Sequence, residues 1–122
     1  MKRILVVDDD DNLRELLATV LSQDGRVVDT ARDGIEALEL LNQNRYDLII
    51  SDLRMPGLNG PLSMKPFEPR RRRRHLRVIF MTGNAATGEY ATFLRGTTEP
   101  VLEKPFSLDV VRQMVRVLLN ER

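Results

Sequence analysis

The sequence contains no cysteine, a single histidine and no long hydrophobic run. Without cysteine the chain can form neither a disulfide framework nor a thiolate metal site. Its apolar runs reach about five residues, whereas a membrane-spanning helix needs roughly 20. Acidic residues follow the first apolar run, where a secretory signal peptide would carry small residues. These absences favour a globular domain of the cytoplasm that has no membrane partner.

Charge is nearly balanced, with 19 basic and 18 acidic residues and a net charge of +1. The balance depends on five consecutive arginines, Arg70 to Arg74, without which the net charge would be −4. Such a block can bind nucleic acid phosphates. No aromatic residue interleaves this one, so we interpret it as a solvated basic face and consider direct nucleic-acid binding unexpected. His75, the single histidine, is interpreted as a surface residue.

Short apolar runs alternate with amphipathic segments along the chain. This alternation predicts an α/β fold, which is a doubly wound parallel sheet between two layers of helices. We expect one domain over residues 1–122. Strands are expected at residues 4–7, 26–30 (more polar, near an edge), 48–50, 78–81 and 101–102. Helices are expected where apolar residues recur at helical spacing: Leu13, Leu16, Leu17, Val20 and Leu21; Ile35, Leu38 and Leu41; Leu108, Val111, Val115 and Leu118.

The segment 61–77 interrupts this alternation of strands and helices. It should carry the crossover helix between the third and fourth strands, but Pro66 and Pro69 cannot both lie inside a regular helix. We expect a short or distorted helix at 61–65, a break, and a basic helical turn at 70–75.

Polar side chains stand where the predicted strands end. Asp8 and Asp9 follow the first strand, Asp52 the third, Thr82 the fourth and Lys104 the fifth. In an open parallel sheet the functional site lies at the carboxyl ends of the strands, so these five residues are expected at one edge.

Three clustered carboxylates do not all ionise readily unless a cation is present. Oxygen ligands suit a hard ion, and Mg²⁺ in particular where a phosphate shares the coordination shell. Lys104 offers a positive charge to an anion and Thr82 a hydrogen-bond donor. The set predicts phosphoryl transfer with Asp52 as the nucleophile.

The chain resembles a response-regulator receiver domain over nearly its whole length. The matching residues are Asp8-Asp9 after ILVV, Asp52 in IISDLRMPGLNG, Thr82 in VIFMTGNA and Lys104-Pro105 in VLEKPF. The resemblance implies a three-layer, flavodoxin-like (βα)5 fold with strand order 2-1-3-4-5. It also implies that Asp52 accepts a phosphoryl group from a phosphohistidine on a sensor histidine kinase or histidine phosphotransfer protein, and that Thr82 and Lys104 contact the phosphoryl oxygens.

For the metal, the resemblance implies that Asp9 and Asp52 ligate Mg²⁺ directly together with the backbone carbonyl of Arg54, and that Asp8 acts through water. On this interpretation Asp11 caps the first helix and Asp10 is solvated. The protein would be a signalling phosphoacceptor that catalyses its own phosphorylation and dephosphorylation and controls an output domain or protein partner, through a face at about residues 86–119.

The sequence departs from the family pattern three residues before Lys104. Members usually carry an aromatic residue there that reports phosphorylation, whereas this chain has Val101. The usual threonine–aromatic switch is therefore not expected in its common form, although Tyr90 and Phe93 could respond instead. Glu99-Pro100 in the preceding loop makes the chain resemble receivers attached to hybrid sensor kinases. No output domain follows Arg122, so we expect a stand-alone receiver or one excised from a longer protein.

Two other functions fit parts of this pattern. A phosphatase of the haloacid-dehalogenase type also uses an aspartate after a strand together with Mg²⁺, and Asp8-Asp9-Asp10 could imitate its Asp-x-Asp motif. That motif continues with Thr or Val, whereas Asn12 stands here, and the chain is short for that fold. A pseudo-receiver that binds partners without phosphorylation is the other alternative, and the presence of all five site residues argues against it.

Overall fold

A five-stranded parallel sheet forms the centre of the molecule, with strand order β2-β1-β3-β4-β5. The computed structural model describes residues 1–53, 73, 75–83 and 91–121. The sheet and its order confirm the predicted fold class. Its strands are β1 (Arg3–Val7), β2 (Val27–Ala31), β3 (Leu48–Asp52), β4 (Arg77–Thr82) and β5 (Val101–Glu103).

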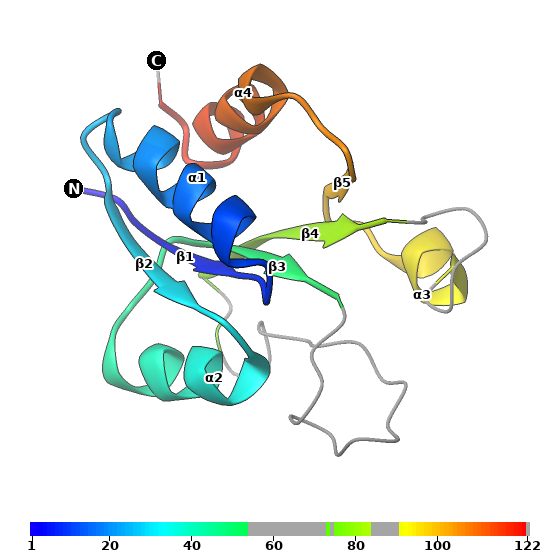
Figure 1. The fold of residues 1–122 in the computed structure, drawn as a ribbon, viewed down its shortest axis with the longest axis horizontal. Coiled ribbons are helices and arrows are strands. Elements are labelled where there is room, and N and C mark those ends of the chain that lie inside the picture. Colours follow the sequence, from blue (N-terminus) through cyan, green and yellow to red (C-terminus); the bar gives the residue numbers. More distant parts are fainter. Residues whose placement is uncertain (54–72, 74, 84–90, 122) are drawn as a thin grey trace.

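Helices cover both faces of the sheet. In Figure 1, α1 and α4 lie on one side of it and α2 and α3 on the other. The helices are α1 (Asp11–Ser22), α2 (Gly34–Gln43), α3 (Ala91–Gly96) and α4 (Leu108–Leu118). Within the described residues no helix is long and apolar enough to cross a bilayer. The expected helix at 61–65 and most of the expected basic turn at 70–75 lie outside the described residues; His75 is exposed, as predicted.

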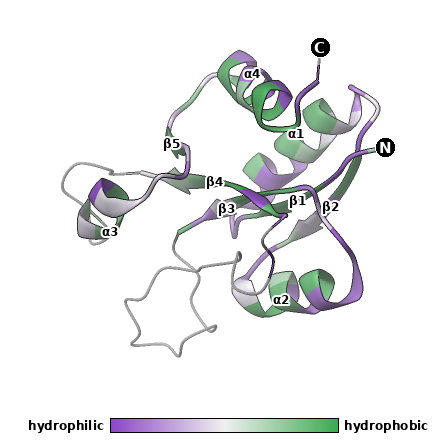
Figure 2. Ribbon diagram, turned by 180° about the vertical axis from the view of Figure 1, so that it is seen from behind, coloured by the Kyte–Doolittle hydropathy of each residue, from purple (hydrophilic) through white to green (hydrophobic). Residues whose placement is uncertain are grey.

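The core has two halves because side chains alternate across each strand. On β1, Ile4 and Val6 pack beneath α1 and α4, whereas Leu5 and Val7 pack on the side of α2. All four are fully buried, which explains why the central strands are continuous apolar runs. Figure 2 shows hydrophobic segments running through the sheet and along the helices that cover it. The more polar β2 forms an edge, as the sequence predicted.

Capping residues set where three helices begin. Asp33 caps α2 and Ser107 caps α4, each accepting a backbone N–H of its helix. The prediction that Asp11 caps α1 is wrong, whereas Asp10 is exposed to solvent as predicted. Asp10 is the cap, because its Oδ1 accepts the backbone N–H groups of Asn12 and Leu13 at 3.0 and 3.2 Å. Asp11 is instead the first helical residue.

Two aliphatic side chains that were expected on buried helix faces are exposed. Leu16 on α1 is 46% exposed and Ile35 on α2 is 52% exposed. The sheet contacts only a narrow stripe of each helix, which on α1 is centred on Leu17 and Leu21. On α4, Val111 and Val115 are buried as predicted, while Leu118 is partly buried.

A charged cluster joins the end of α4 to the turn after α1. The buried guanidinium of Arg26 pairs with Asp24 and with Glu121, and Arg112 of α4 also pairs with Asp24, at 2.9 Å. Asn120 has a positive φ of 54°, so the chain turns after α4 and places Glu121 beside Arg26. Gly25, with a φ of 84°, makes the corresponding turn after α1.

A second, partly buried polar cluster lies near the middle of β2. The Tyr46 hydroxyl donates to Asp29 at 2.6 Å, and Arg3 donates to the same carboxylate oxygen at 3.0 and 3.1 Å. Arg3 also lies over the Tyr46 ring, 5.4 Å from its centroid. Burial, followed by the hydrogen bond and negative charge of Asp29, raises the pKa of Tyr46 to about 12.

We expect Tyr46→Phe to lower the free energy of unfolding by roughly 1 kcal/mol at pH 7, because it removes the hydrogen bond to Asp29. The folded pKa of Tyr46 is above the unfolded value near 10, so its stabilising contribution is complete below pH 10 and is lost as pH rises towards 12. The stability difference between wild type and variant should therefore shrink between pH 10 and 12. Urea unfolding across this range measures it, and a difference that stays constant would contradict the assignment.

Candidate functional site

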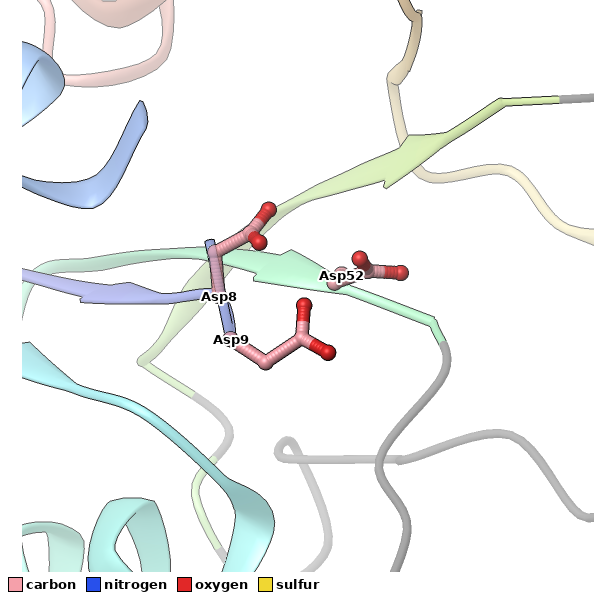
Figure 3. Close-up of side chains that lie close together, drawn as sticks. All are labelled: Asp8, Asp9 and Asp52. Atoms are coloured by element: carbon pink, nitrogen blue, oxygen red, sulfur yellow. The ribbon is translucent and has the colours of Figure 1, made fainter. Parts of the chain in front are cut away.

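The five predicted site residues lie where strands of the sheet end. Asp8 and Asp9 follow β1, Asp52 is the last residue of β3, Thr82 is the last of β4, and Lys104 follows β5. Because the strands are parallel, all of these positions are at the same edge. Figure 3 shows Asp8 and Asp9 at the end of β1 and Asp52 at the end of the adjacent β3.

The three carboxylates approach one another closely enough to share an ion. Each offers one oxygen such that these oxygens lie within 4.8 Å of one another. Their exposure differs: Asp8 is completely buried, Asp52 is half-buried and Asp9 is exposed. The site therefore has a buried end at Asp8 and an open end at Asp9, through which a ligand can arrive.

Asp8 is fixed through every polar group it has. Its backbone N–H donates to Ala31 of β2 at 3.1 Å, and its carbonyl accepts Arg14 Nη1 at 2.8 Å. Its Oδ1 accepts the backbone N–H of Asp10 at 2.9 Å, and its Oδ2 accepts the ammonium of Lys104 at 2.8 Å. A carboxylate buried to this degree requires such partners.

Lys104 lies between the two strand-end carboxylates. Its Nζ is 2.8 Å from Asp8 Oδ2 and 3.2 Å from Asp52 Oδ2. Its backbone N–H donates to the carbonyl of Thr82 at 2.8 Å, which places the residue at the edge of the sheet. Burial by itself lowers the pKa of Lys104, but the hydrogen bond to Asp8 and the charges of Asp52 and Asp8 outweigh that effect and raise it. Lys104 is therefore a stable cation here.

The donor set fits a small hard cation. Asp8, Asp9 and Asp52 offer only oxygen, the donor that Mg²⁺ and Ca²⁺ prefer. Mg²⁺ usually takes one or two carboxylates and keeps water and phosphate in its remaining positions, which agrees with the open side at Asp9. The predicted fourth ligand, the carbonyl of Arg54, lies outside the described residues.

Thr82 and the region of Val101 lie beside one another across β4 and β5. Thr82 is buried, with 9% of its surface exposed. Two residues earlier, Phe80 pairs with Val101 in the sheet and contacts Phe93 of α3 in an edge-to-face arrangement, with ring centroids 5.4 Å apart and planes at 79°. An aromatic contact with α3 is therefore present although residue 101 is valine. Tyr90, the other aromatic residue considered, lies outside the described residues.

One side chain in this region was missed by sequence reasoning. Arg14 contacts both the Asp8 carbonyl and the Asp11 carboxylate, at 2.8 and 2.6 Å. In the sequence it is simply a polar residue on an amphipathic helix. The available signal was its spacing from Asp11, because residues three apart share a helix face; this signal covers the pairing with Asp11 and not the contact with the Asp8 carbonyl.

Comparison with known proteins gives a consistent family. The family model described as response regulator receiver domain matches residues 4–116. The response regulator MprA of Mycobacterium sp. strain KMS is 37% identical over 118 residues, which cover 97% of this chain and 50% of that protein. The sensor histidine kinase RcsC of Escherichia coli is also 37% identical over 118 residues, covering 93% of this chain and 12% of that protein. The chain thus spans at most half the length of these relatives.

Solved structures agree in fold. The receiver domain of the Francisella response regulator 1452 superposes with a TM-score of 0.80 at 30% identity and covers 98% of both chains. The response regulator protein TrrA of Thermotoga maritima, in complex with Mg²⁺–BeF, superposes with a TM-score of 0.76 at 34% identity, covering 97% of this chain and 99% of that one.

We expect Lys104→Met to lower the free energy of unfolding by about 3 kcal/mol without divalent cations, because Asp8 then remains buried with its charge uncompensated. Mg²⁺ should stabilise this variant more than wild type, since the ion no longer competes with the ammonium for the same carboxylates. Urea unfolding with and without Mg²⁺ gives both quantities.

The matched control is Lys2→Met, which removes an exposed lysine near the opposite ends of the strands. It should change neither the stability nor the response to Mg²⁺. If Lys104→Met behaved like this control, the ion pairs of Lys104 would not be what balances the carboxylate cluster.

Proposed function

The chain belongs to the response-regulator receiver domain family, and from this premise we propose that it is a phosphoacceptor switch of a two-component or phosphorelay pathway. Asp52 accepts a phosphoryl group from a phosphohistidine on a sensor histidine kinase or a histidine phosphotransfer protein. The observation that carries the proposal is the position of Asp52, a half-buried carboxylate within reach of Lys104, Asp8 and Asp9 at one edge of the sheet.

The transfer follows from the chemistry of these groups. One carboxylate oxygen of Asp52 attacks the phosphorus atom, the bond between phosphorus and the donor's imidazole nitrogen breaks, and the electron pair of that bond remains on the imidazole. The attack places additional negative charge beside Asp8 and Asp9. Lys104 is 3.2 Å from Asp52 and can pair with a phosphoryl oxygen, while the hydroxyl of Thr82 donates a hydrogen bond to another.

Magnesium is the cofactor we propose for this site. Asp8, Asp9 and Asp52 would hold it, with Asp8 acting through water, and the carbonyl of Arg54 is added from the family resemblance alone. When bound, Mg²⁺ neutralises the negative charge that gathers between the carboxylates and the phosphoryl group. The structure of the relative TrrA, which is in complex with Mg²⁺–BeF, supports this assignment.

The output is a change of conformation that a partner reads. Thr82 ends β4 and Lys104 directly follows β5, so when Lys104 exchanges carboxylate for phosphoryl oxygens and Thr82 binds another of them, the displacement reaches β5 and the adjacent α3. We therefore propose that an output domain or protein partner binds the face formed by α3, β5 and α4. The domain is a signalling phosphoacceptor of the cytoplasm that catalyses its own phosphorylation and dephosphorylation.

Intact-mass measurement after incubation with acetyl phosphate and Mg²⁺ tests the proposal. Wild type should gain one phosphoryl group because Asp52 is an accessible nucleophile, and Asp52→Asn should gain none. Chelation of Mg²⁺ should abolish the adduct in wild type, which identifies the metal requirement in the same experiment.

Asp109→Asn is the matched control, because Asp109 is an exposed acid in the first turn of α4, away from the strand ends. It should be phosphorylated like wild type. If wild type gained no phosphoryl group while its circular dichroism showed an intact fold, the chain would be a pseudo-receiver.

A further inference from the structure

Arg14 is the described arginine that contacts the acidic loop between β1 and α1. Its side chain is only 14% exposed. Nη1 donates to the backbone carbonyl of Asp8 at 2.8 Å, and Nη2 donates to the carboxylate of Asp11 at 2.6 Å. The planar guanidinium thus connects the beginning and the end of the loop, a geometry for which arginine is better suited than lysine.

The carbonyl that Arg14 holds belongs to the peptide that joins Asp8 to Asp9. A peptide unit is planar and rigid, so fixing its oxygen fixes the direction in which the chain enters Asp9. The Asp9 carboxylate accepts no hydrogen bond from the other described residues, and the side chain is exposed. The backbone therefore decides where its Cβ lies and which rotamers it can adopt, in contrast to Asp8, whose two carboxylate oxygens both have partners.

We propose that Arg14 is a positioning residue, which orients Asp9 towards Asp8 and Asp52 for a divalent cation. The inference rests on the proposed function and adds to it a residue outside the five that define the site. Arg14 acts through the Asp8–Asp9 peptide and touches neither the cation nor the phosphoryl group.

The proposal and simple electrostatics predict opposite changes in Mg²⁺ affinity when Arg14 is removed. Arg14 carries a positive charge close to the site, so if charge were its main contribution, its removal would tighten binding of Mg²⁺. If Arg14 orients a ligand, its removal weakens binding, because Asp9 then samples directions that do not face the ion. Loss of a group that orients a metal ligand typically weakens affinity on the order of tenfold.

Isothermal titration calorimetry with Mg²⁺ on wild type, Arg14→Met and Arg32→Met separates these effects. Arg32 follows β2 at the same edge of the sheet, but its side chain is 73% exposed and pairs only weakly with Glu36, at 3.5 Å. Arg32→Met therefore removes an equal charge without touching the loop. We expect about tenfold weaker binding for Arg14→Met and unchanged or slightly tighter binding for Arg32→Met.

A second readout distinguishes positioning from a purely structural role. With acetyl phosphate as donor, Arg14→Met should need more Mg²⁺ for half of its maximal phosphorylation rate but should approach the wild-type rate at saturation. In the ¹H–¹⁵N NMR spectrum, the amide of Asp9 should shift in metal-free Arg14→Met. If Arg14→Met does not fold, Arg14→Lys replaces it. Lysine keeps the charge but cannot contact Asp8 and Asp11 with two nitrogens of one planar group, so binding should weaken by up to about tenfold.

Each outcome has one meaning. Mg²⁺ affinity in a folded Arg14→Met equal to or tighter than wild type overturns the role of Arg14 and leaves the proposed function intact. If Arg14→Met is unfolded, an Mg²⁺ affinity of Arg14→Lys equal to that of wild type overturns the role of Arg14 instead. If wild type itself bound no Mg²⁺, the proposed metal-dependent function would fail first, and the inference about Arg14 with it.

Discussion

The ammonium of Lys104 lies between two carboxylates that reach it from different strands, Asp8 after β1 and Asp52 at the end of β3. Much of the surrounding structure depends on this arrangement. Asp8 is completely buried, and a charge in that position requires a nearby cation and several hydrogen bonds. Lys104 supplies the cation from the far side of β4, and the backbone N–H of Asp10 donates a hydrogen bond to the carboxylate. The ends of three strands, β1, β3 and β5, are thereby joined by one charged cluster.

The same contact gives the site its chemical character. The carboxylates are arranged to require positive charge, yet a lysine meets that requirement only partly, since three acids face a single ammonium. In the function we propose, a divalent cation supplies the remainder and an arriving phosphoryl group offers Lys104 a new partner. That proposal thus gives the site two states, one with the lysine bound to carboxylates and one with it bound to phosphoryl oxygens, which is the requirement for a switch.

The sheet and the site were largely predictable from the sequence because both follow from short patterns. Buried parallel strands are continuous apolar runs, as in Ile4 to Val7, and the polar residues that end them must meet at one edge. What depends on exact geometry was not predictable. Asp10 and Asp11 are adjacent acids, and only the backbone angles decide that Asp10 is the cap. Exposure of Ile35 depends on how α2 lies on the sheet, and the contact of Arg14 with a backbone carbonyl leaves no pattern of residue types.

The two helical layers are fastened to the sheet with different firmness. On one side, the cluster of Asp24, Arg26, Arg112 and Glu121 ties the end of α4 to the turn after α1, so that the two helices form a braced unit. On the other side, α3 is six residues long, has no fully buried side chain, and rests on the sheet through Phe93 and its neighbour Leu94. Among the described helices, α3 therefore has the least extensive packing against the sheet, whereas α2 on the same side buries Ala37 and Leu41.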